Sequence, residues 1–140
     1  MVAMVEKIIS GEMVLNYHLM HPGAASRPGD PNVAFYLEGK YHLHYILSHP
    51  WKGEISYSFI HVTSEDMLNW TWQKTKLQPS FTGHGMFSGT GFITKGGIPA
   101  AIYCAETLKQ RNTYITLAKD KNLSSWNKPY PLLPKGGPDG

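Results

Sequence analysis

Strand-like segments recur along this chain at a spacing of about 57 residues. The segment GKYHLHY, residues 39–45, aligns with GIPAAIY, residues 97–103. Further along, HVTSEDMLNW, residues 61–70, aligns with LAKDKNLSSW, residues 117–126, in the same order. A repeat of this length, with apolar and polar residues alternating inside it, is typical of tandem β-sheet units.

Each unit contains four segments with the alternation and flanking turn residues of β-strands. The dipeptides Glu38-Gly39 and Gly96-Gly97 mark the first hairpin of each unit. The composition agrees, because 14 Gly, 10 Pro and 12% aromatic residues favour many short strands joined by turns. The expected strands are residues 30–37, 40–48, 55–63 and 70–77, then 88–95, 98–104, 112–118 and 126–132.

We therefore predict an all-β fold, a partial β-propeller with two four-stranded antiparallel blades. Residues 1–16 would form an N-terminal segment, residues 17–82 the first blade and residues 83–140 the second. Trp70 and Trp126 occupy the same place in the two units, so we expect them to pack between neighbouring blades. The alternative is a single eight-stranded sandwich, which would not need the two tryptophans in register.

Two blades cannot close a propeller ring. The first and last blades would expose unpaired edges, and apolar faces would meet water. We predict that the fold is completed by oligomerisation or by chain missing from this sequence. In the first case the partner would be another copy of the chain, giving a homo-oligomer formed through the exposed blade edges.

The repeat also relates two polar side chains. Asp30 precedes Gly39 by the same distance as Ser88 precedes Gly97, so the two positions are equivalent. The first strand of a propeller blade is the innermost, and the starts of these strands converge on one end of the central channel. We predict that Asp30 and Ser88 face the same channel.

Charge and cysteine content exclude several classes of protein. The net charge of +3 comes from 13 Lys and Arg against 10 Asp and Glu, without a cationic run, so no nucleic-acid partner is predicted. The N-terminal residues contain no apolar run long enough for a signal peptide or membrane span, so no membrane partner is predicted. Cys104 stands alone in AAIYCA, which predicts a buried thiol and fits the cytosol, although the compartment stays open.

Four ordered motifs carry a resemblance to a known family. They are GDPN at residues 29–32, KYHLHY at 40–45, HVTSEDMLNW at 61–70 and MFSGTG at 86–91. Together they resemble the N-terminal part of glycoside hydrolase family 32, the invertase and fructosidase family, which has a five-bladed catalytic propeller. The resemblance covers about residues 16–135.

The resemblance implies roles for individual residues. Asp30 corresponds to the catalytic nucleophile that attacks the anomeric carbon, and Asn32 to an accompanying sugar-binding amide. Phe87 and Ser88 correspond to the family's sugar-contacting Phe-Ser-Gly-Ser motif, with Thr90 in its last place. Trp51, on an expected loop, is an aromatic candidate for stacking on the sugar.

Other positions correspond to structural features or depart from the family. Asp66, Met67 and Trp70 match a surface turn, which we interpret as structural. Three positions depart from the family pattern and indicate a divergent branch: Gly29, Ile46 and Phe59 replace Asn, Gln and Trp respectively.

Retaining glycoside hydrolysis needs a nucleophilic carboxylate and a proton-donating carboxylic acid about 5–5.5 Å apart. In family 32 the donor comes from a later blade, and no acid of this chain fills that place. The remaining acids are expected in turns, at strand ends or before the first unit: Glu6, Glu12, Glu38, Glu54, Glu65, Asp66, Glu106, Asp120 and Asp139.

The resemblance thus predicts hydrolysis of O-glycosidic bonds in fructosides or related saccharides by a retaining double displacement, with the general acid absent from this chain. The partner would be a carbohydrate substrate. One alternative is a non-catalytic carbohydrate-binding or assembly module. Another is a propeller hydrolase acting on arabinosides or xylosides, in which the first-blade Asp is a general base.

Two histidines are candidates for metal binding. His42 and His44 lie two residues apart on one expected strand, so both face the same side and could bind a metal. No third ligand is evident, and packing between blades is the preferred interpretation, so no metal or cofactor is predicted. His49, Phe81 and His84 join Trp51 as expected rim residues on loops.

Overall fold

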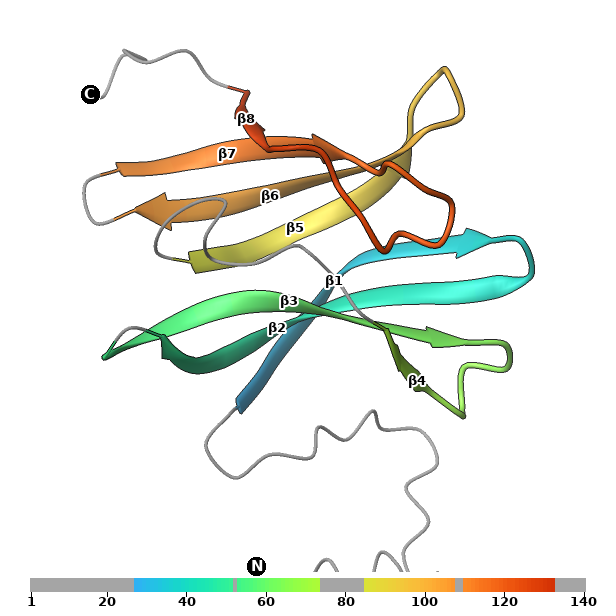
Figure 1. The fold of residues 1–140 in the computed structure, drawn as a ribbon, viewed down its shortest axis with the longest axis horizontal. Coiled ribbons are helices and arrows are strands. Elements are labelled where there is room, and N and C mark those ends of the chain that lie inside the picture. Colours follow the sequence, from blue (N-terminus) through green and yellow to red (C-terminus); the bar gives the residue numbers. More distant parts are fainter. Residues whose placement is uncertain (1–26, 52, 74–84, 108–109, 133–140) are drawn as a thin grey trace, which may run out of the picture.

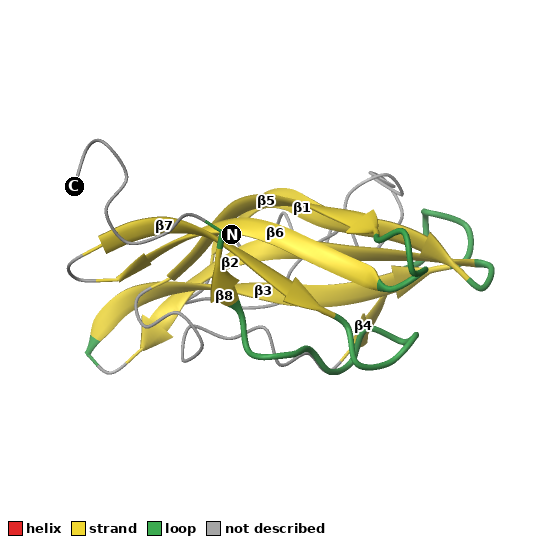
Figure 2. Cartoon of the chain, turned by 90° about the horizontal axis from the view of Figure 1, so that it is seen from above, coloured by secondary structure: helices red, strands yellow, loops and turns green. Residues whose placement is uncertain are grey.

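The computed structural model describes residues 27–51, 53–73, 85–107 and 110–132. In these ranges every regular element is a β-strand, and Figure 2 shows strands and loops without a helix. It follows that the described part of the chain has no apolar helix of membrane-spanning length. The predicted unit boundaries near residues 16 and 82 fall outside the described ranges and stay predictions.

The strands form two consecutive groups, which lie one above the other in Figure 1. The first group, in blue to green, is β1 (Arg27–Leu37), β2 (Lys40–Trp51), β3 (Glu54–Ser64) and β4 (Thr71–Gln73). The second group, in yellow to red, is β5 (Gly85–Ile93), β6 (Pro99–Thr107), β7 (Gln110–Leu117) and β8 (Tyr130–Pro131). We call these groups blade 1 and blade 2.

Within each blade, every strand pairs antiparallel with the next. A single parallel pairing, between Tyr57 of β3 and Gly85 of β5, joins the two blades into one open eight-stranded sheet. The all-β prediction is confirmed, and each blade has the four-stranded up-and-down order expected of a propeller blade.

The backbone repeats between the blades, as the sequence pattern predicts. Gly39 and Gly97 both adopt positive φ, 83° and 77°, in the turn between the first two strands of each blade. In blade 1 this turn is a two-residue connection, since Leu37 pairs directly with Lys40. Glycine suits these positions because it has no Cβ to clash at positive φ.

The turns that precede the outer strands also correspond. Met67 and Leu123 have positive φ, 63° and 56°. The indole Nε1 of Trp70 donates to the Met67 carbonyl at 3.2 Å, and that of Trp126 donates to the Leu123 carbonyl at 3.1 Å. The aligned tryptophans therefore belong to equivalent turns.

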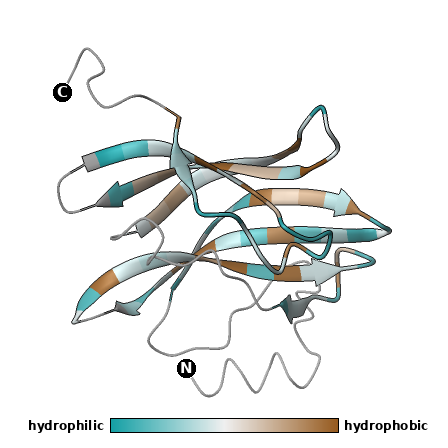
Figure 3. Cartoon of the chain, turned by 45° about the horizontal axis from the view of Figure 1, so that its top comes forward, coloured by the Kyte–Doolittle hydropathy of each residue, from teal (hydrophilic) through white to brown (hydrophobic). Residues whose placement is uncertain are grey.

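The main core lies between the facing surfaces of the two blades. Figure 3 shows hydrophobic and hydrophilic residues interspersed along the strands. Side chains on a strand alternate between its two faces, so the long strands can present apolar residues to this core and polar residues to the other side. Blade 1 contributes Val33, Phe35, Ile46 and Phe59, and blade 2 contributes Met86, Ala101, Tyr103, Ala105, Ala118, Leu123 and Trp126.

The two tryptophans lie on different faces. Trp126 is 3% exposed, and its ring centroid lies 6.4 Å from that of Phe35 and 5.7 Å from that of His44. Its predicted packing between blades is confirmed. Trp70 is half-buried against a second, smaller cluster on the opposite face of blade 1, which includes Tyr45 and Val62.

Three expectations about strand ends and burial are wrong. β2 runs through Trp51, which places that residue and His49 in a strand rather than on a loop. β8 is only Tyr130–Pro131, because prolines in this segment lack the N–H groups that a longer ladder needs. Cys104 is half-buried, because it alternates onto the face of β6 away from the core, and its Sγ accepts from Arg111 Nε at 3.1 Å.

Three histidines lie buried beside the core: His42, His44 and His61 are 6%, 0% and 0% exposed. His42 Nδ1 and His61 Nε2 are 3.0 Å apart, and the rings of His44 and His61 stack with centroids 4.3 Å apart. His44 Nδ1 donates to the Val33 carbonyl at 3.0 Å. The predicted packing between blades is confirmed for His44, which contacts Trp126 of the other blade. His42 packs against His61 within blade 1.

Burial holds these imidazoles in the neutral form. It lowers the pKa of His44 to about 4 and, together with the neighbouring His44 and His42, that of His61 to about 2. Burial also lowers the pKa of His42, with Lys40 adding to the effect. His44 Nε2 and His61 Nδ1 have no hydrogen-bond partner, so a proton added there would be poorly solvated.

Acid should therefore unfold the protein through these histidines. In the unfolded chain they protonate near the ordinary pKa of 6.5, whereas the folded state resists protonation. Stability is fully present above that value, and each of His44 and His61 should lower the free energy of unfolding by about 1.4 kcal/mol per pH unit below it. The loss from His44 levels off near its folded pKa of about 4. Urea unfolding between about pH 7.5 and pH 5 measures this slope.

A His61→Gln variant supplies the comparison. Because the variant has one fewer group that takes up a proton on unfolding, its free energy of unfolding should fall less steeply with decreasing pH, by the contribution of one proton. A wild-type stability that does not change across this range would contradict the prediction.

β1 and β5 run side by side, and glycine permits the contact. A Cβ at Gly91 would lie 2.6 Å from Phe35 Cζ and 2.8 Å from the Ala34 carbonyl oxygen. Both distances are shorter than van der Waals contact, so a larger residue would force the two blades apart.

Gly91→Ala should therefore lower the free energy of unfolding by about 1–3 kcal/mol, as measured by urea denaturation. The matched control is Gly96→Ala, because a Cβ there would meet nothing nearer than Thr94 Oγ1 at 3.9 Å. Equal losses in the two variants would show that backbone entropy, rather than the contact between β1 and β5, sets the cost.

Candidate functional site

Asp30 and Ser88 lie at equivalent irregularities of the two innermost strands. The pairing of β1 with β2 shifts register between Pro28 and Pro31, and that of β5 with β6 shifts between Met86 and Gly89. These shifts leave Gly29 and Asp30 of β1, and Phe87 and Ser88 of β5, out of the ladders; a second shift in β1, between Pro31 and Val33, also leaves out Asn32. Such bulges re-aim side chains and are common beside active sites.

Asn32 connects the two irregular segments. Its Nδ2 donates to the Asp30 carbonyl oxygen at 2.9 Å, and its Oδ1 accepts from the Gly89 backbone N–H at 3.1 Å. Asn32 therefore ties the segment that carries Asp30 to the residue that follows Ser88. The structure brings these sequence-predicted residues together, on neighbouring strands of different blades.

The residues of this site differ in how far they are exposed to solvent. Asp30 and Ser88 are both exposed. Among the described residues, none donates a hydrogen bond to the Asp30 carboxylate. Phe87 is half-buried, and its ring centroid lies 4.9 Å from that of Tyr57 in β3. Phe87 thus has a packing role between the blades in addition to any contact with a ligand.

Trp51 ends β2 at the same end of blade 1 as Asp30. Arg27, at the start of β1, pairs with Ser48, so Trp51 lies just beyond that pair along the neighbouring strand. His49 Nδ1 donates to the Pro50 carbonyl at 2.9 Å, and its Nε2 accepts from Ser58 Oγ at 2.7 Å. Phe81 and His84, the other expected rim residues, lie outside the described residues.

The three departures from the family pattern are neighbours in space. Ile46 pairs with Phe59 across β2 and β3, and a Cβ at Gly29 would lie 3.4 Å from Ile46 Cβ. Ile46 is 7% exposed and Phe59 is 0% exposed. The three departures therefore form one apolar surface beneath the segment that carries Asp30. None of these three residues has a side chain that can donate a hydrogen bond to the Asp30 carboxylate.

The other acids of the described ranges are largely engaged elsewhere. Glu38 pairs with Lys121 at 2.7 Å, and Glu65 pairs with Lys40 at 3.5 Å. Asp120 accepts from the backbone N–H and the hydroxyl of Ser124. None of these groups provides a second carboxylate beside Asp30.

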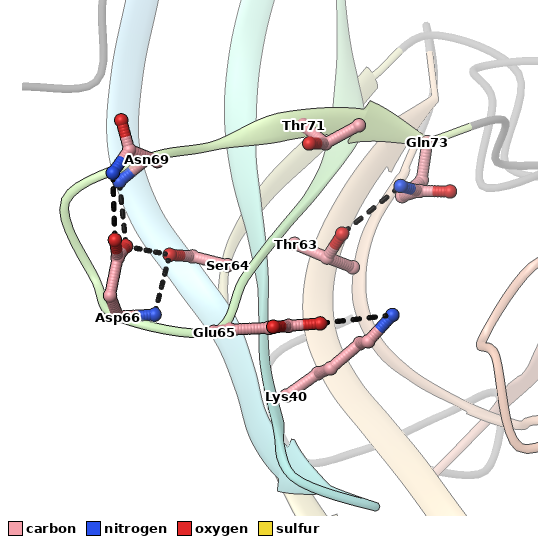
Figure 4. Close-up of a pocket in the computed structure, with 8 residues that line it drawn as sticks. All are labelled: Lys40, Thr63, Ser64, Glu65, Asp66, Asn69, Thr71 and Gln73. Atoms are coloured by element: carbon pink, nitrogen blue, oxygen red, sulfur yellow. Dashed lines mark hydrogen bonds and ion pairs between the residues drawn. The ribbon is translucent and has the colours of Figure 1, made fainter.

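Asp66 is used by the turn between β3 and β4, which borders a polar depression of about 330 Å³ (Figure 4). Its carboxylate accepts from the backbone N–H and side chain of Asn69, from the Leu68 N–H and from Ser64 Oγ. These bonds, the one from the Asn69 backbone foremost, hold the pKa of Asp66 well below its usual range. The interpretation of this turn as structural agrees with that network.

A metal site is not formed where the histidines suggested one. Among the described residues, no group of three His, Cys, Asp or Glu side chains could hold a metal ion. The three buried histidines stack on each other rather than pointing at a common centre.

The comparisons with known proteins decide the family. The model of the glycosyl hydrolases family 32 N-terminal domain matches residues 26–138. The chain belongs to glycosyl hydrolase family 32. The insoluble isoenzyme 7 of β-fructofuranosidase from Oryza sativa subsp. indica is 36% identical over 110 residues, which cover 71% of this chain and 18% of that protein. The fructan 6-exohydrolase of Triticum aestivum is 33% identical over 132 residues, covering 84% and 21%.

A solved family 32 structure has the same fold. Fructan 1-exohydrolase IIa from Cichorium intybus superposes with a TM-score of 0.67 at 22% identity, over 87% of this chain and 24% of that one. Another structure of that enzyme, in complex with 1-kestose, gives a TM-score of 0.65 at 24% identity. The predicted partial β-propeller is thus confirmed in place of the sandwich. The chain spans about a fifth of the length of these family 32 relatives.

Sequence reasoning missed one structural role at the site. Asn32, which is expected to bind sugar, also forms hydrogen bonds within the protein through both the nitrogen and the oxygen of its amide. The position of Asn32 after the GDP turn gives no signal of its partner Gly89, which is 57 residues away and on the other blade.

Asn32→Ala should lower the free energy of unfolding by about 1–2 kcal/mol, because it leaves the part-buried Gly89 N–H without its acceptor. The exposed Asn122 in the β7–β8 connection provides a matched control, and Asn122→Ala should change stability by no more than about 0.5 kcal/mol. Chemical denaturation of both variants tests this. Equal stability of the two would show that the bond does not tie the blades together.

Proposed function

We propose that this family 32 chain supplies the nucleophile half of a retaining glycosidase site, with Asp30 as the nucleophile. The site would act on O-glycosidic bonds of fructosides or related saccharides. The observation that supports this most is the pair of equivalent bulges, which exposes Asp30 and Ser88 on neighbouring innermost strands. In this proposal Ser88, Phe87, Asn32 and Trp51 shape the sugar subsite.

In the proposed reaction this chain supplies the nucleophile. A carboxylate can attack an anomeric carbon, forming a glycosyl-enzyme ester as the leaving-group bond breaks. Protonation of a sugar leaving group requires a second carboxylic acid, and we infer that this group lies outside the chain. The apolar surface formed by Gly29, Ile46 and Phe59 would leave the Asp30 carboxylate available for attack rather than hydrogen-bonded from below.

The relatives support a carbohydrate as the ligand class. They are fructofuranosidases and fructan exohydrolases, and one of the solved structures contains 1-kestose. We further propose that the open ring of two blades is completed either by further chain or by self-association through the exposed blade edges.

A substrate with a leaving group that needs no acid can test the nucleophile separately. On incubation with β-fructofuranosyl fluoride, the Asp30 carboxylate should displace fluoride and gain one fructosyl unit, detected by intact-mass and peptide mass spectrometry. Asp30→Asn should form no adduct. Glu54→Gln removes an exposed acid at the same end of blade 1 and should leave labelling unchanged.

The outcome also separates the alternative functions. Binding of 1-kestose without labelling, unaffected by Asp30→Asn, would indicate a non-catalytic carbohydrate-binding module and overturn the proposal. Labelling at another residue would remove Asp30 from the nucleophile role. A general-base function, as in the arabinoside or xyloside alternative, would likewise give no covalent adduct.

A further inference from the structure

The part of β1 that carries Asp30, residues 28–33, is here called the bulged segment. Its pairing with β2 shifts register twice, between Pro28 and Pro31 and again between Pro31 and Val33. The two prolines have no N–H group to donate to the ladder. Regular pairing resumes at Val33, which lies opposite His44 of β2. The bulged segment therefore depends on contacts other than the ladder to hold its position.

Side chains supply those contacts on two consecutive residues. Asn32 joins the bulged segment to blade 2, because its Oδ1 accepts from the Gly89 N–H at 3.1 Å. Directly after it, the Val33 carbonyl accepts from His44 Nδ1 at 3.0 Å. A shift of Val33 would move Asn32, and with it Asp30, whose carbonyl oxygen accepts from Asn32 Nδ2 at 2.9 Å.

The packing of His44 fixes the direction in which its Nδ1 atom points. The side chain is fully buried, and its ring stacks on that of His61 with the two planes 9° apart. It also meets Trp126 of blade 2 edge-on, with the ring planes at 80°. In a densely packed interior these contacts oppose rotation of the imidazole. The donor is therefore held toward β1.

The hydrogen bond accounts for the presence of a polar ring at this position. A backbone carbonyl can only accept, so Nδ1 of His44 carries the proton and Nε2 does not. Nε2 is buried without a hydrogen-bond partner, which is unfavourable. An apolar ring would fill the space without this cost. The bond to Val33 is what a histidine adds here.

We propose that His44 is a positioning residue for Asp30, because it anchors the bulged segment through the Val33 carbonyl. His44 does not touch the sugar. It acts through Val33 and Asn32 on the place from which the carboxylate attacks. This inference rests on the nucleophile role proposed for Asp30, whereas the anchoring itself can be measured without any reaction.

Two substitutions separate the hydrogen bond from the packing of the ring. His44→Phe keeps a ring of similar size but cannot donate to the Val33 carbonyl. His44→Asn places its amide nitrogen near the position of the imidazole Nδ1 and can keep the bond, but it leaves a cavity where the ring packs. His44→Asn should therefore be the less stable of the two variants in urea denaturation.

Labelling of Asp30 by β-fructofuranosyl fluoride should follow the hydrogen bond rather than the stability. The rate should fall by roughly tenfold in His44→Phe, because a small misplacement of the attacking atom is costly. It should stay within about twofold of wild type in His44→Asn, under conditions in which all the chains are folded. A rate that follows stability instead, or a wild-type rate in His44→Phe, would overturn the proposal.

Hydrogen exchange at the Gly89 amide reports on the anchor without a reaction. Loss of the bond to Val33 should free Asn32 and speed exchange of the Gly89 N–H by roughly fivefold or more in His44→Phe. His44→Asn should keep the protection of wild type, and unchanged protection in His44→Phe would overturn the proposal. If wild type is not labelled by the fluoride, the proposed nucleophile role fails, and these exchange rates alone decide whether His44 anchors the segment.

Thr116→Val is the matched control. Thr116 is fully buried, and its Oγ1 donates to the Asn127 carbonyl at 2.6 Å, so it makes the same kind of bond within blade 2. The variant should lower stability in urea denaturation but leave the labelling rate and the exchange of the Gly89 N–H unchanged. Effects as large as those of His44→Phe would show that both readouts follow general destabilisation, and would overturn the proposal.

Discussion

The close contact between β1 and β5 is the constraint on which the rest of this structure depends. At this contact the Asn32 side chain accepts a hydrogen bond from the Gly89 N–H, and Phe35 lies where Gly91 leaves room. Hydrogen bonding between the blades is otherwise sparse, since one parallel pairing links them in the sheet. The relative position of the blades, and hence of Asp30 and Ser88, is therefore set by this contact and by the core packed beside it.

The core between the blades also explains why the divergent positions are tolerated. Ile46 and Phe59 oppose each other in adjacent strands and are almost fully buried, so apolar residues at both positions are mutually compatible. The buried histidines, in contrast, place polar groups in the interior at a cost in stability. They fill the same interface with polar rings that must remain neutral, and two of their nitrogens have no partner. Such groups fix a specific arrangement at some cost in stability.

Much of the fold could be predicted from the sequence because a propeller blade is a local structure. The turns at Gly39 and Gly97, and those at Met67 and Leu123, depend on a few consecutive residues, and the repeat shows them twice. Strand ends were harder to predict, as at β2 and β8, because the extent of a ladder depends on its partner strand. The half-buried state of Cys104 was missed for a related reason: an apolar neighbourhood in sequence does not reveal which face of a strand meets the core.

The sequence by itself determined the all-β class, the two-unit repeat and the equivalence of Asp30 with Ser88. These features follow from the alternation of apolar and polar residues and from the turn residues, which depend only on neighbours in the chain. Only the tertiary structure decided how Asn32 is used, which acids are engaged in turns and ion pairs, and that Gly29, Ile46 and Phe59 form one apolar surface. These facts depend on contacts between residues far apart in the chain, and such contacts are settled by how the blades pack rather than by any local pattern.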